Sequence, residues 1–451
     1  MGKAKVAKKL LISSVVGCGV VASGASAFDY DVYGGAYMFS KIGFNNVKVN
    51  ENTGKYPTDS WASIALDLNI KGSFVDGFTY GLGGMLSAPV WDPYQASYAY
   101  INGNARHSLN NNSNDEIGYR YYVLATAYLG YQFKNDTIDV GIKAGRFDDL
   151  NTDWFSGFGE GVKLWAGNDL IKFQFNWITR RAFAYNEWFY DFYSVGKADK
   201  WDYNRDFLVG AFDINVGDFN IKPQVWYHRN DYIAPGLNLG YTFDNGIVSA
   251  KTSAYSLFIL SHKNLANGVG MYRNGTDNKL STILIVKEDI SHMGWDFGLG
   301  VRKNWGNPRG NSGMGQHGNP SGLDDWTASA GTKDFWGFDA WALNDINGWN
   351  AFTGWLSMGK AYESFDWNII ARVTTAKESD EQSIALNMGY NATEVIRLGL
   401  KLEWFNDISK RFERVNGVNL PSGNPYSAEL QSIDKVRNDR SHAFLTFEYK
   451  F

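Results

Sequence analysis

The end of this chain, residues 445–451, alternates strictly between apolar and polar side chains. Leu445, Phe447, Tyr449 and Phe451 fall on one face of an extended strand, and the polar residues between them fall on the other. An apolar stripe that faces lipid, opposite a polar stripe that faces water, is typical of a transmembrane β-barrel strand. In a soluble edge strand the same exposed aromatic end would promote aggregation. The pattern therefore predicts that this strand closes a barrel within a membrane.

The N-terminal segment has the features of a secretory signal peptide. An apolar stretch, residues 10–21, precedes the small-residue cleavage site Ala25-Ser26-Ala27 and follows the lysines Lys3, Lys5, Lys8 and Lys9. We expect residues 1–27 to be a signal peptide and residues 28–451 to form an outer-membrane β-barrel. The alternative, a transmembrane anchor, is disfavoured because the apolar stretch is far shorter than the ~20 residues that span a bilayer.

A second alternative for this segment is a lipid anchor at Cys18. Val15-Val16-Gly17-Cys18 is a loose lipobox, but apolar residues continue beyond Cys18 and a cleavage site follows. A barrel also needs no attached lipid to stay in a membrane. Cys18 is the only cysteine, so the mature chain can form no disulfide and no cysteine-based metal or redox site.

The composition agrees with a barrel whose strands have one wet face. Hydrophobic residues make up 44% of the chain, yet the mean hydropathy is −0.33, as expected when half of each strand faces water. The 29 Phe, 26 Tyr and 17 Trp residues suit the aromatic girdles of a barrel, and only 9 prolines interrupt strand pairing. Without the four signal-peptide lysines, 39 basic residues oppose 47 acidic ones. The resulting net charge of about −8 argues against nucleic acid as a partner.

Alternation of period two, bounded by turn residues, marks the candidate strands. A clear example is the row Ile64, Leu66, Leu68 and Ile70, which alternates with smaller or polar residues. The eighteen segments, an even number as bacterial single-chain barrels require, are 30–43, 61–71, 77–87, 117–133, 138–146, 160–166, 170–177, 207–215, 219–228, 236–243, 247–261, 280–290, 295–305, 353–362, 366–377, 383–393, 395–405 and 441–451.

The connections between these segments alternate between short and mostly longer ones. Asp244-Asn245-Gly246 is a short one with the chemistry of a hairpin turn, whereas 88–116, 178–206, 306–352 and 407–440 are long. Short periplasmic turns and long extracellular loops are the asymmetry of an outer-membrane barrel. The predicted fold class is therefore all-β: a transmembrane antiparallel β-barrel of about 18 strands, with long extracellular loops and short periplasmic turns. Such a barrel is wide enough for an aqueous channel.

The same alternation assigns side chains to the lumen wall. More basic than acidic residues fall on the inward face, and a pore lined by Lys and Arg favours anions. The alternative is that a mixed polar lumen has no selectivity, and a register error of one residue would reverse a strand's assignment. The inward acids are Asp67, Asp139, Asp296, Glu403 and Glu448. The inward cations are Lys71, Lys143, Lys163, Lys172, Lys222, Arg302, Arg372, Arg397 and Lys401.

One segment, residues 179–193, is aromatic and carries charges of both signs. We expect it to fold into the lumen as the pore constriction, since exposed clusters of this size usually mark a site. Aromatic rings would pack the segment against the wall while its charged groups line the passage. The alternative is an extracellular loop packed on itself at the membrane rim. The predicted constriction residues are Arg180, Arg181, Tyr185, Glu187 and Asp191.

Two stretches carry a resemblance to a known family. Residues 181–193 resemble the signature stretch of the Hof family of outer-membrane proteins, and the early segment 47–65 is also similar to that family. Hof proteins are in turn similar to OprD-type porins, which are eighteen-stranded barrels that pass small, often anionic, solutes. The aromatic C-terminus resembles the signature by which such barrels are recognised for assembly. The resemblance implies outer-membrane lipid, small hydrophilic solutes and the barrel assembly machinery as partners.

Enzymatic interpretations are weakly supported by the sequence. The six histidines are scattered, neither H-E-x-x-H nor G-x-S-x-G occurs, and the glycines of 306–322 follow no phosphate-binding pattern. We therefore expect no catalytic residues, no metal and no cofactor. Three functions remain open: a porin-like channel for passive diffusion of small hydrophilic solutes, a surface adhesin or recognition barrel acting through its extracellular loops, and an outer-membrane enzyme. Single-channel conductance separates the first from the other two.

Overall fold

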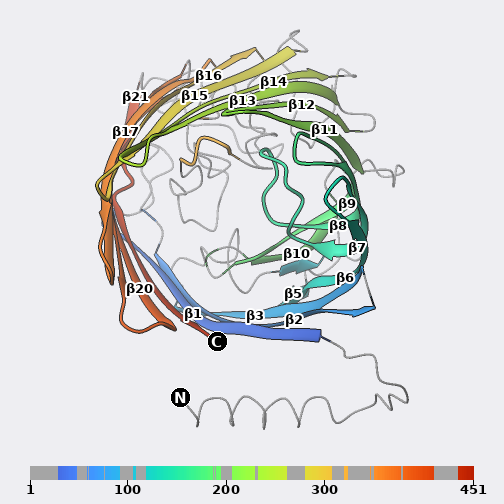
Figure 1. Ribbon diagram of the computed structural model, residues 1–451. Coiled ribbons are helices and arrows are strands. Elements are labelled where there is room, and N and C mark those ends of the chain that lie inside the picture. Colours follow the sequence, from blue (N-terminus) through green and yellow to red (C-terminus); the bar gives the residue numbers. More distant parts are fainter. Residues whose placement is uncertain are drawn as a thin grey trace, which may run out of the picture.

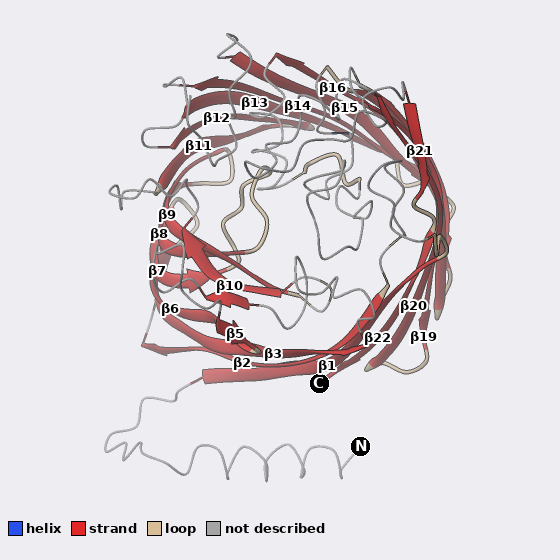
Figure 2. Ribbon diagram, turned by 180° about the vertical axis from the view of Figure 1, so that it is seen from behind, coloured by secondary structure: helices blue, strands red, loops and turns tan. Residues whose placement is uncertain are grey.

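The chain forms a closed antiparallel β-barrel, seen along its axis in the computed structural model of Figure 1. Twenty strands share one continuous sheet, and two of them, β10 and β21, extend a neighbouring strand rather than add to the ring, which leaves eighteen. The ring closes where β1 pairs with β22. Each of the other ring strands pairs with its neighbours in the chain, and the view from the opposite end shows the same closed ring (Figure 2).

The strands have the following bounds: β1 (Asp29–Gly43), β2 (Trp61–Val75), β3 (Phe78–Trp91), β4 (Ala105–His107), β5 (Gly118–Arg120), β6 (Tyr122–Lys134), β7 (Asp139–Phe147), β8 (Phe158–Gly167), β9 (Ile171–Ala184), β10 (Phe189–Ser194), β11 (Phe207–Val216), β12 (Phe219–His228), β13 (Tyr232–Asp244), β14 (Val248–Ser261), β15 (Leu280–His292), β16 (Trp295–Gly306), β17 (Phe352–Ala361), β18 (Phe365–Thr375), β19 (Ser379–Asn391), β20 (Ile396–Lys410), β21 (Lys435–Asp439) and β22 (His442–Lys450). Among the described strands, the short strands β4 and β5 pair with each other and not with the barrel sheet.

The structure describes residues 29–47, 58, 60–75, 77–91, 105–107, 118–185, 187, 189–194, 206–228, 232–261, 280–306, 319–323, 346, 350–376, 379–410 and 435–451. The predicted signal peptide, residues 1–27, lies outside these ranges. So does most of the connections 88–116, 306–352 and 407–440. No helix in the described ranges is long and apolar enough to cross a membrane.

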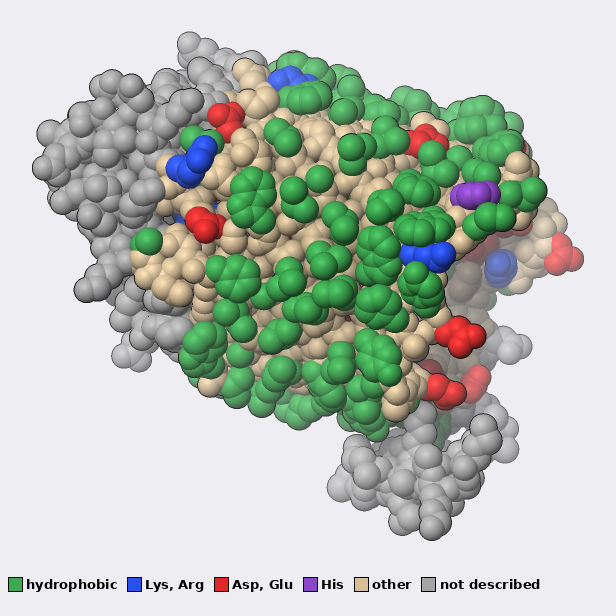
Figure 3. Space-filling view, turned by 90° about the vertical axis from the view of Figure 1, so that its left-hand side faces the viewer, with side chains coloured by type: hydrophobic (Ala, Val, Ile, Leu, Met, Phe, Trp, Pro, Cys, Tyr) green, Lys and Arg blue, Asp and Glu red, His purple; other side chains and the backbone are tan. Residues whose placement is uncertain are grey.

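The two faces of the wall differ as the alternation predicts. On β2 the outward side chains of Ile64, Leu66 and Leu68 are about half exposed, whereas Ala65 between them is buried inside. Figure 3 shows the outer wall on one side of the barrel as a broad band of hydrophobic side chains, with most charged groups near its two edges. Such a band is the lipid-facing surface of a membrane barrel.

The eighteen predicted strands all have counterparts in the ring, and most of their bounds agree within four residues, with three larger differences. The predicted strand 117–133 is divided into β5 and β6, and β20 runs several residues past the predicted end of 395–405. The strand predicted at 170–177 continues to Ala184 because its last residues form a hairpin with β10. The connection predicted as 178–206 is therefore partly strand.

The C-terminal residue takes part in the closure of the ring. The Phe451 amide donates to the Gly34 carbonyl at 3.0 Å, and the Gly34 amide donates to the Phe451 carbonyl at 3.2 Å. These two bonds extend the β1–β22 ladder by one residue. The Phe451 ring lies 6.1 Å from the ring of Tyr449 on the outer face, measured between ring centroids.

Deleting Phe451 should therefore weaken closure of the barrel. Loss of two backbone hydrogen bonds costs about 2 kcal/mol, and we expect less heat-modifiable, folded barrel by gel electrophoresis of outer membranes. The matched control is Phe451→Leu, which keeps both backbone bonds and an apolar side chain. Normal folded yield of the deletion variant would contradict the role of this residue in closure.

Candidate functional site: the narrowed lumen

The connection between β7 and β8, residues 148–157, turns into the barrel rather than away from it. Leu150 and Trp154 are fully or almost fully buried, and Phe155 packs against the same cluster. Asn151 turns the chain with a φ of 54°, a conformation that Asn tolerates well. At Gly157 φ is +92°, and a Cβ there would lie 2.5 Å from the Ala182 carbonyl oxygen. Only glycine fits this close return to the wall.

An apolar cluster fills one side of the lumen around this connection. Inward-facing residues of β9, β11, β12, β14, β15 and β17 surround Leu150 and Trp154, and they include Ile178, Phe207, Trp226, Leu257, Ile283 and Trp355. Leu323 and Ile346 belong to the same cluster, so parts of the connection 306–352 also lie inside the barrel. The sequence pattern predicted 306–352 as a long extracellular connection but did not predict that parts of it fold into the lumen. The apolar cluster itself was not predicted either, and burial of its apolar surface offsets the cost of ordering the loops.

The predicted constriction segment also lies inside the ring of strands, where β10 is visible in Figures 1 and 2. Its strand β10 pairs with the end of β9, from Phe189 opposite Ala184 to Ser194 opposite Arg180. Phe189 and Phe192 are buried against Ala65 of β2, Met85 of β3 and inward residues of β6. We call β9 residues 179–184, β10 and the residues between them the inner hairpin.

Arg181 joins the inner hairpin to the β7–β8 connection. Its side chain donates from Nε to the Ser156 carbonyl at 2.7 Å and from a terminal nitrogen to Ser156 Oγ at 2.7 Å. The guanidinium also lies 4.1 Å from the ring centroid of Phe183 and 5.2 Å from that of Phe155. Arg181 is only 1% exposed. Arg181 therefore holds the two inward segments together, and its charge does not face the open lumen.

A cavity of about 570 Å³ remains between the inner hairpin and the opposite wall. Glu187 of the hairpin lines it on one side, and Leu323 lines it from the connection between β16 and β17. The wall side presents charged groups from β18, β19, β20 and β22, together with Phe39 and Phe444. The charged lining groups are Arg372, Arg397, Lys401, Glu187, Glu403 and Glu448. Cations and carboxylates are thus equal in number here.

All nine predicted lumen cations lie on buried or partly buried positions of the wall, but carboxylates accompany most of them. Near the β7–β8 connection, Asp149 binds Lys143 at 2.7 Å and lies 3.6 Å from Lys163. Asp153 of the same connection lies 3.1 Å from Lys222. The remaining ion pairs are Lys172–Asp139 at 2.7 Å, Arg372–Glu381 at 3.6 Å, Arg397–Asp366 at 2.7 Å and Lys401–Glu403 at 2.6 Å.

Two of the nine cations have other kinds of partner. The Lys71 ammonium lies 5.0 Å from the ring centroid of Tyr33. Arg302 donates from Nε to Asn304 at 3.2 Å and from a terminal nitrogen to Asn319 at 3.3 Å, and it is 1% exposed. Arg302 therefore helps to hold residues 319–323 inside the lumen.

The five predicted constriction residues share the inner hairpin but not one environment. Arg180 is half exposed and lies 3.8 Å from Glu160, while Asp191 is buried and accepts a bond from the Phe192 amide. Tyr185 packs near Phe158, and loss of solvent raises the pKa of its hydroxyl, although Arg181 acts in the opposite direction. This hydroxyl is neutral at physiological pH. Of the five, Glu187 lines the cavity.

Sequence reasoning missed the carboxylates that neutralise the wall. Asp149 and Asp153 lie in a connection of the long-loop side, so they were not assigned to the lumen. A usable signal was present, because Leu150, Trp154 and Phe155 in the same connection are too apolar for a loop in water. In the part of the chain that the structure describes, no group of three His, Cys, Asp or Glu residues could hold a metal ion.

The sequence matches the model of a known family. A family model described as "Putative outer membrane protein" matches residues 16–451. The chain belongs to this family. No curated protein sequence matches the chain.

Solved structures of Occ and OprD proteins have a similar fold. OccAB4 of Acinetobacter baumannii is similar over 94% of this chain and 98% of its own, with a TM-score of 0.61 and 9% identity. OccK3 (OpdO) of Pseudomonas aeruginosa covers 94% of this chain and 96% of its own, with a TM-score of 0.54 and 8% identity. A variant of OccD1 (OprD) covers 95% and 97%, with a TM-score of 0.55 and 8% identity. At these identities the likeness establishes the barrel fold.

Replacing Arg181 should loosen the narrowed lumen. Arg181→Met removes the two hydrogen bonds that the charged guanidinium donates to Ser156, a loss that should raise the population of detached hairpin by a factor of about 5–30. We expect larger fluctuations of single-channel current in planar bilayers. Arg180→Met is the matched control, because Arg180 is half exposed and its nearest carboxylate, that of Glu160, lies 3.8 Å away. Equal current noise in the two variants would contradict the role of Arg181 in holding the inner hairpin to the β7–β8 connection.

Proposed function

We propose that the protein is an outer-membrane porin for passive diffusion of small hydrophilic solutes. The observation that carries this proposal is the polar cavity of about 570 Å³ inside a closed barrel, between Glu187 of the inner hairpin and the charged residues of the opposite wall. A lumen narrowed by inward segments but lined by charged groups can admit hydrated solutes and exclude larger ones. Membership of a family of outer membrane proteins and the porin-like fold support the proposal.

The proposal includes the orientation and the route to the membrane. We infer that the long connections are extracellular, that the short turns are periplasmic, and that residues 1–27 are a signal peptide removed on export. The barrel assembly machinery would recognise the C-terminal strand, whose Phe451 ends the closing ladder. The resemblance of residues 181–193 to the Hof family supports an outer-membrane location. That stretch contains most of the inner hairpin. No catalytic role is proposed.

The charge of the wall is consistent with no more than a small preference for anions. The nine inward cations outnumber the five inward acids that alternation assigns, but ion pairs with four further carboxylates, Asp149, Asp153, Asp366 and Glu381, offset this excess of four. Paired charges create a weaker field along the passage than isolated ones. We therefore propose a weakly anion-preferring channel in which individual neutralisations change selectivity measurably.

The Arg397–Asp366 pair gives a matched test of this electrostatic proposal. Both side chains are about 40% exposed, and the Arg397 guanidinium donates to both Asp366 oxygens at 2.9 and 2.7 Å. In planar bilayers under a salt gradient, Arg397→Gln should shift the reversal potential towards cations. Asp366→Asn should shift it towards anions by a similar amount. Both shifts should shrink at high salt, where screening is strong.

A wild-type channel that prefers cations would contradict the anion preference. Absence of any single-channel conductance from folded barrel would contradict the porin itself. It would leave the surface adhesin or recognition barrel, acting through its long loops, as the alternative function.

A further inference from the structure

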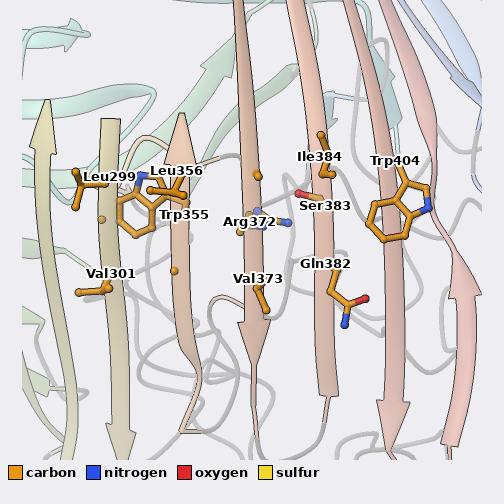
Figure 4. Close-up of a pocket in the computed structure, with 13 residues that line it drawn as sticks. Leu299, Val301, Trp355, Leu356, Arg372, Val373, Gln382, Ser383, Ile384 and Trp404 are labelled. Carbon is orange, nitrogen blue, oxygen red and sulfur yellow. The ribbon is translucent and has the colours of Figure 1, made fainter. Parts of the chain in front are cut away.

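A groove of about 620 Å³ lies on the outer wall of the barrel, opposite the lumen side of the same strands. Figure 4 shows its lining side chains on β16, β17, β18, β19 and β20. In the register of the sheet, one row across these strands runs from Val301 past Gly354 and Val373 to Gln382. The next row runs from Leu299 past Leu356 and Ala371 to Ile384 and Trp404.

The groove is open because small residues form its floor between large apolar neighbours. Leu356 is 65% exposed, and Val373, Ile384 and Trp404 are each at least half exposed. A Cβ added to Gly354 would meet no atom within 4 Å. Arg372 borders the groove only through its position in the wall, because its side chain is 4% exposed and pairs with Glu381 inside. The groove surface is therefore apolar.

The position of the groove identifies what covers it. It lies within the lipid-facing band, so hydrocarbon rather than water is its normal surrounding. Gly354 is near the start of β17 and Val373 near the end of β18, so the groove occupies the half of the wall closer to the long connections. In the orientation proposed above, this half faces the outer leaflet.

A cation borders the groove on its long-loop side. Lys303 follows Val301 by two residues on β16 and so shares its outward face. Its ammonium donates to the Asn350 carbonyl at 2.6 Å and lies 5.9 Å from the Trp305 ring centroid. On the opposite side of the groove, beyond Trp404, β21 pairs with the end of β20. There Arg437 lies opposite Ile408 and Asp439 opposite Asn406, so charges of both signs are present. A phosphate is therefore best accommodated on the β16 side.

We propose that this groove binds an acyl chain of an outer-leaflet glycolipid of the lipid A type, with a phosphate of its headgroup at Lys303. The chain lies along the apolar floor over Gly354 and Ala371, and the indole of Trp404 bounds it at the β20 edge. The inference rests on the proposed membrane orientation, but it does not depend on solute passage through the lumen.

Two glycine variants provide the test. Gly354→Leu places a side chain in the groove, and its Cβ meets no atom within 4 Å. The matched control is Gly210→Leu on β11, where a Cβ also meets no atom within 4 Å and the neighbours Val209 and Ala211 face inward. Native mass spectrometry of the detergent-solubilised barrel titrated with purified lipid A measures retention of the lipid. We expect Gly354→Leu to weaken retention about tenfold, the equivalent of about two methylenes losing their contacts, and Gly210→Leu to match wild type.

Three results would overturn the proposal. Retention of lipid A by Gly354→Leu equal to wild type would exclude the groove, and unchanged retention by Lys303→Gln would exclude the phosphate position. A change of oligomeric state in Gly354→Leu but not in Gly210→Leu would assign the face to a second copy of the chain. Single-channel conductance of Gly354→Leu should stay at the wild-type value, so failure of this inference is distinguishable from failure of the porin proposal.

Discussion

The hydrogen-bonded ladder between β1 and β22 is the interaction on which the rest of the structure depends. Within hydrocarbon an unpaired strand edge costs several kcal/mol per backbone group, so a sheet can cross a membrane only when it closes. Closure pairs Gly35 with Lys450 and Gly43 with His442, and Phe451 adds the final pair of bonds. The alternation of side chains then follows from geometry, since every second residue must meet lipid.

A ring of this size has an interior that its own wall side chains cannot fill. Two inward segments occupy much of it, and each has an apolar anchor: Trp154 for the β7–β8 connection and Phe189 for the inner hairpin. Arg181 connects them through Ser156, so the two segments support each other. What remains is a smaller polar cavity against the wall of β18, β19, β20 and β22. The narrowing is thus a consequence of packing, and the polar lining is what is left exposed.

The barrel itself was predictable from the sequence because alternation, turn chemistry and the aromatic end all depend on local residue order. Inward folding of the segment 179–193 was also predicted, since its aromatic content required burial. The apolar side of the lumen was missed, although the continuous apolar run from Leu257 to Leu260 indicates a strand buried on both faces. The carboxylates that pair with the lumen cations were not predictable in the same way. Asp149 reaches Lys143 and Lys163 only through the path of a connection, which period-two patterning does not specify.

The central claim is that the inner hairpin narrows a conducting lumen. Ala184 and Phe189 are already paired across the hairpin, so an Asn-Gly turn can replace residues 185–188 without changing the strand register. Single-channel conductance of this variant should exceed that of wild type, whereas Glu187→Gln, which changes charge but not size, should leave a smaller effect. Equal conductance of the shortened variant and wild type, with both barrels folded, would contradict the account.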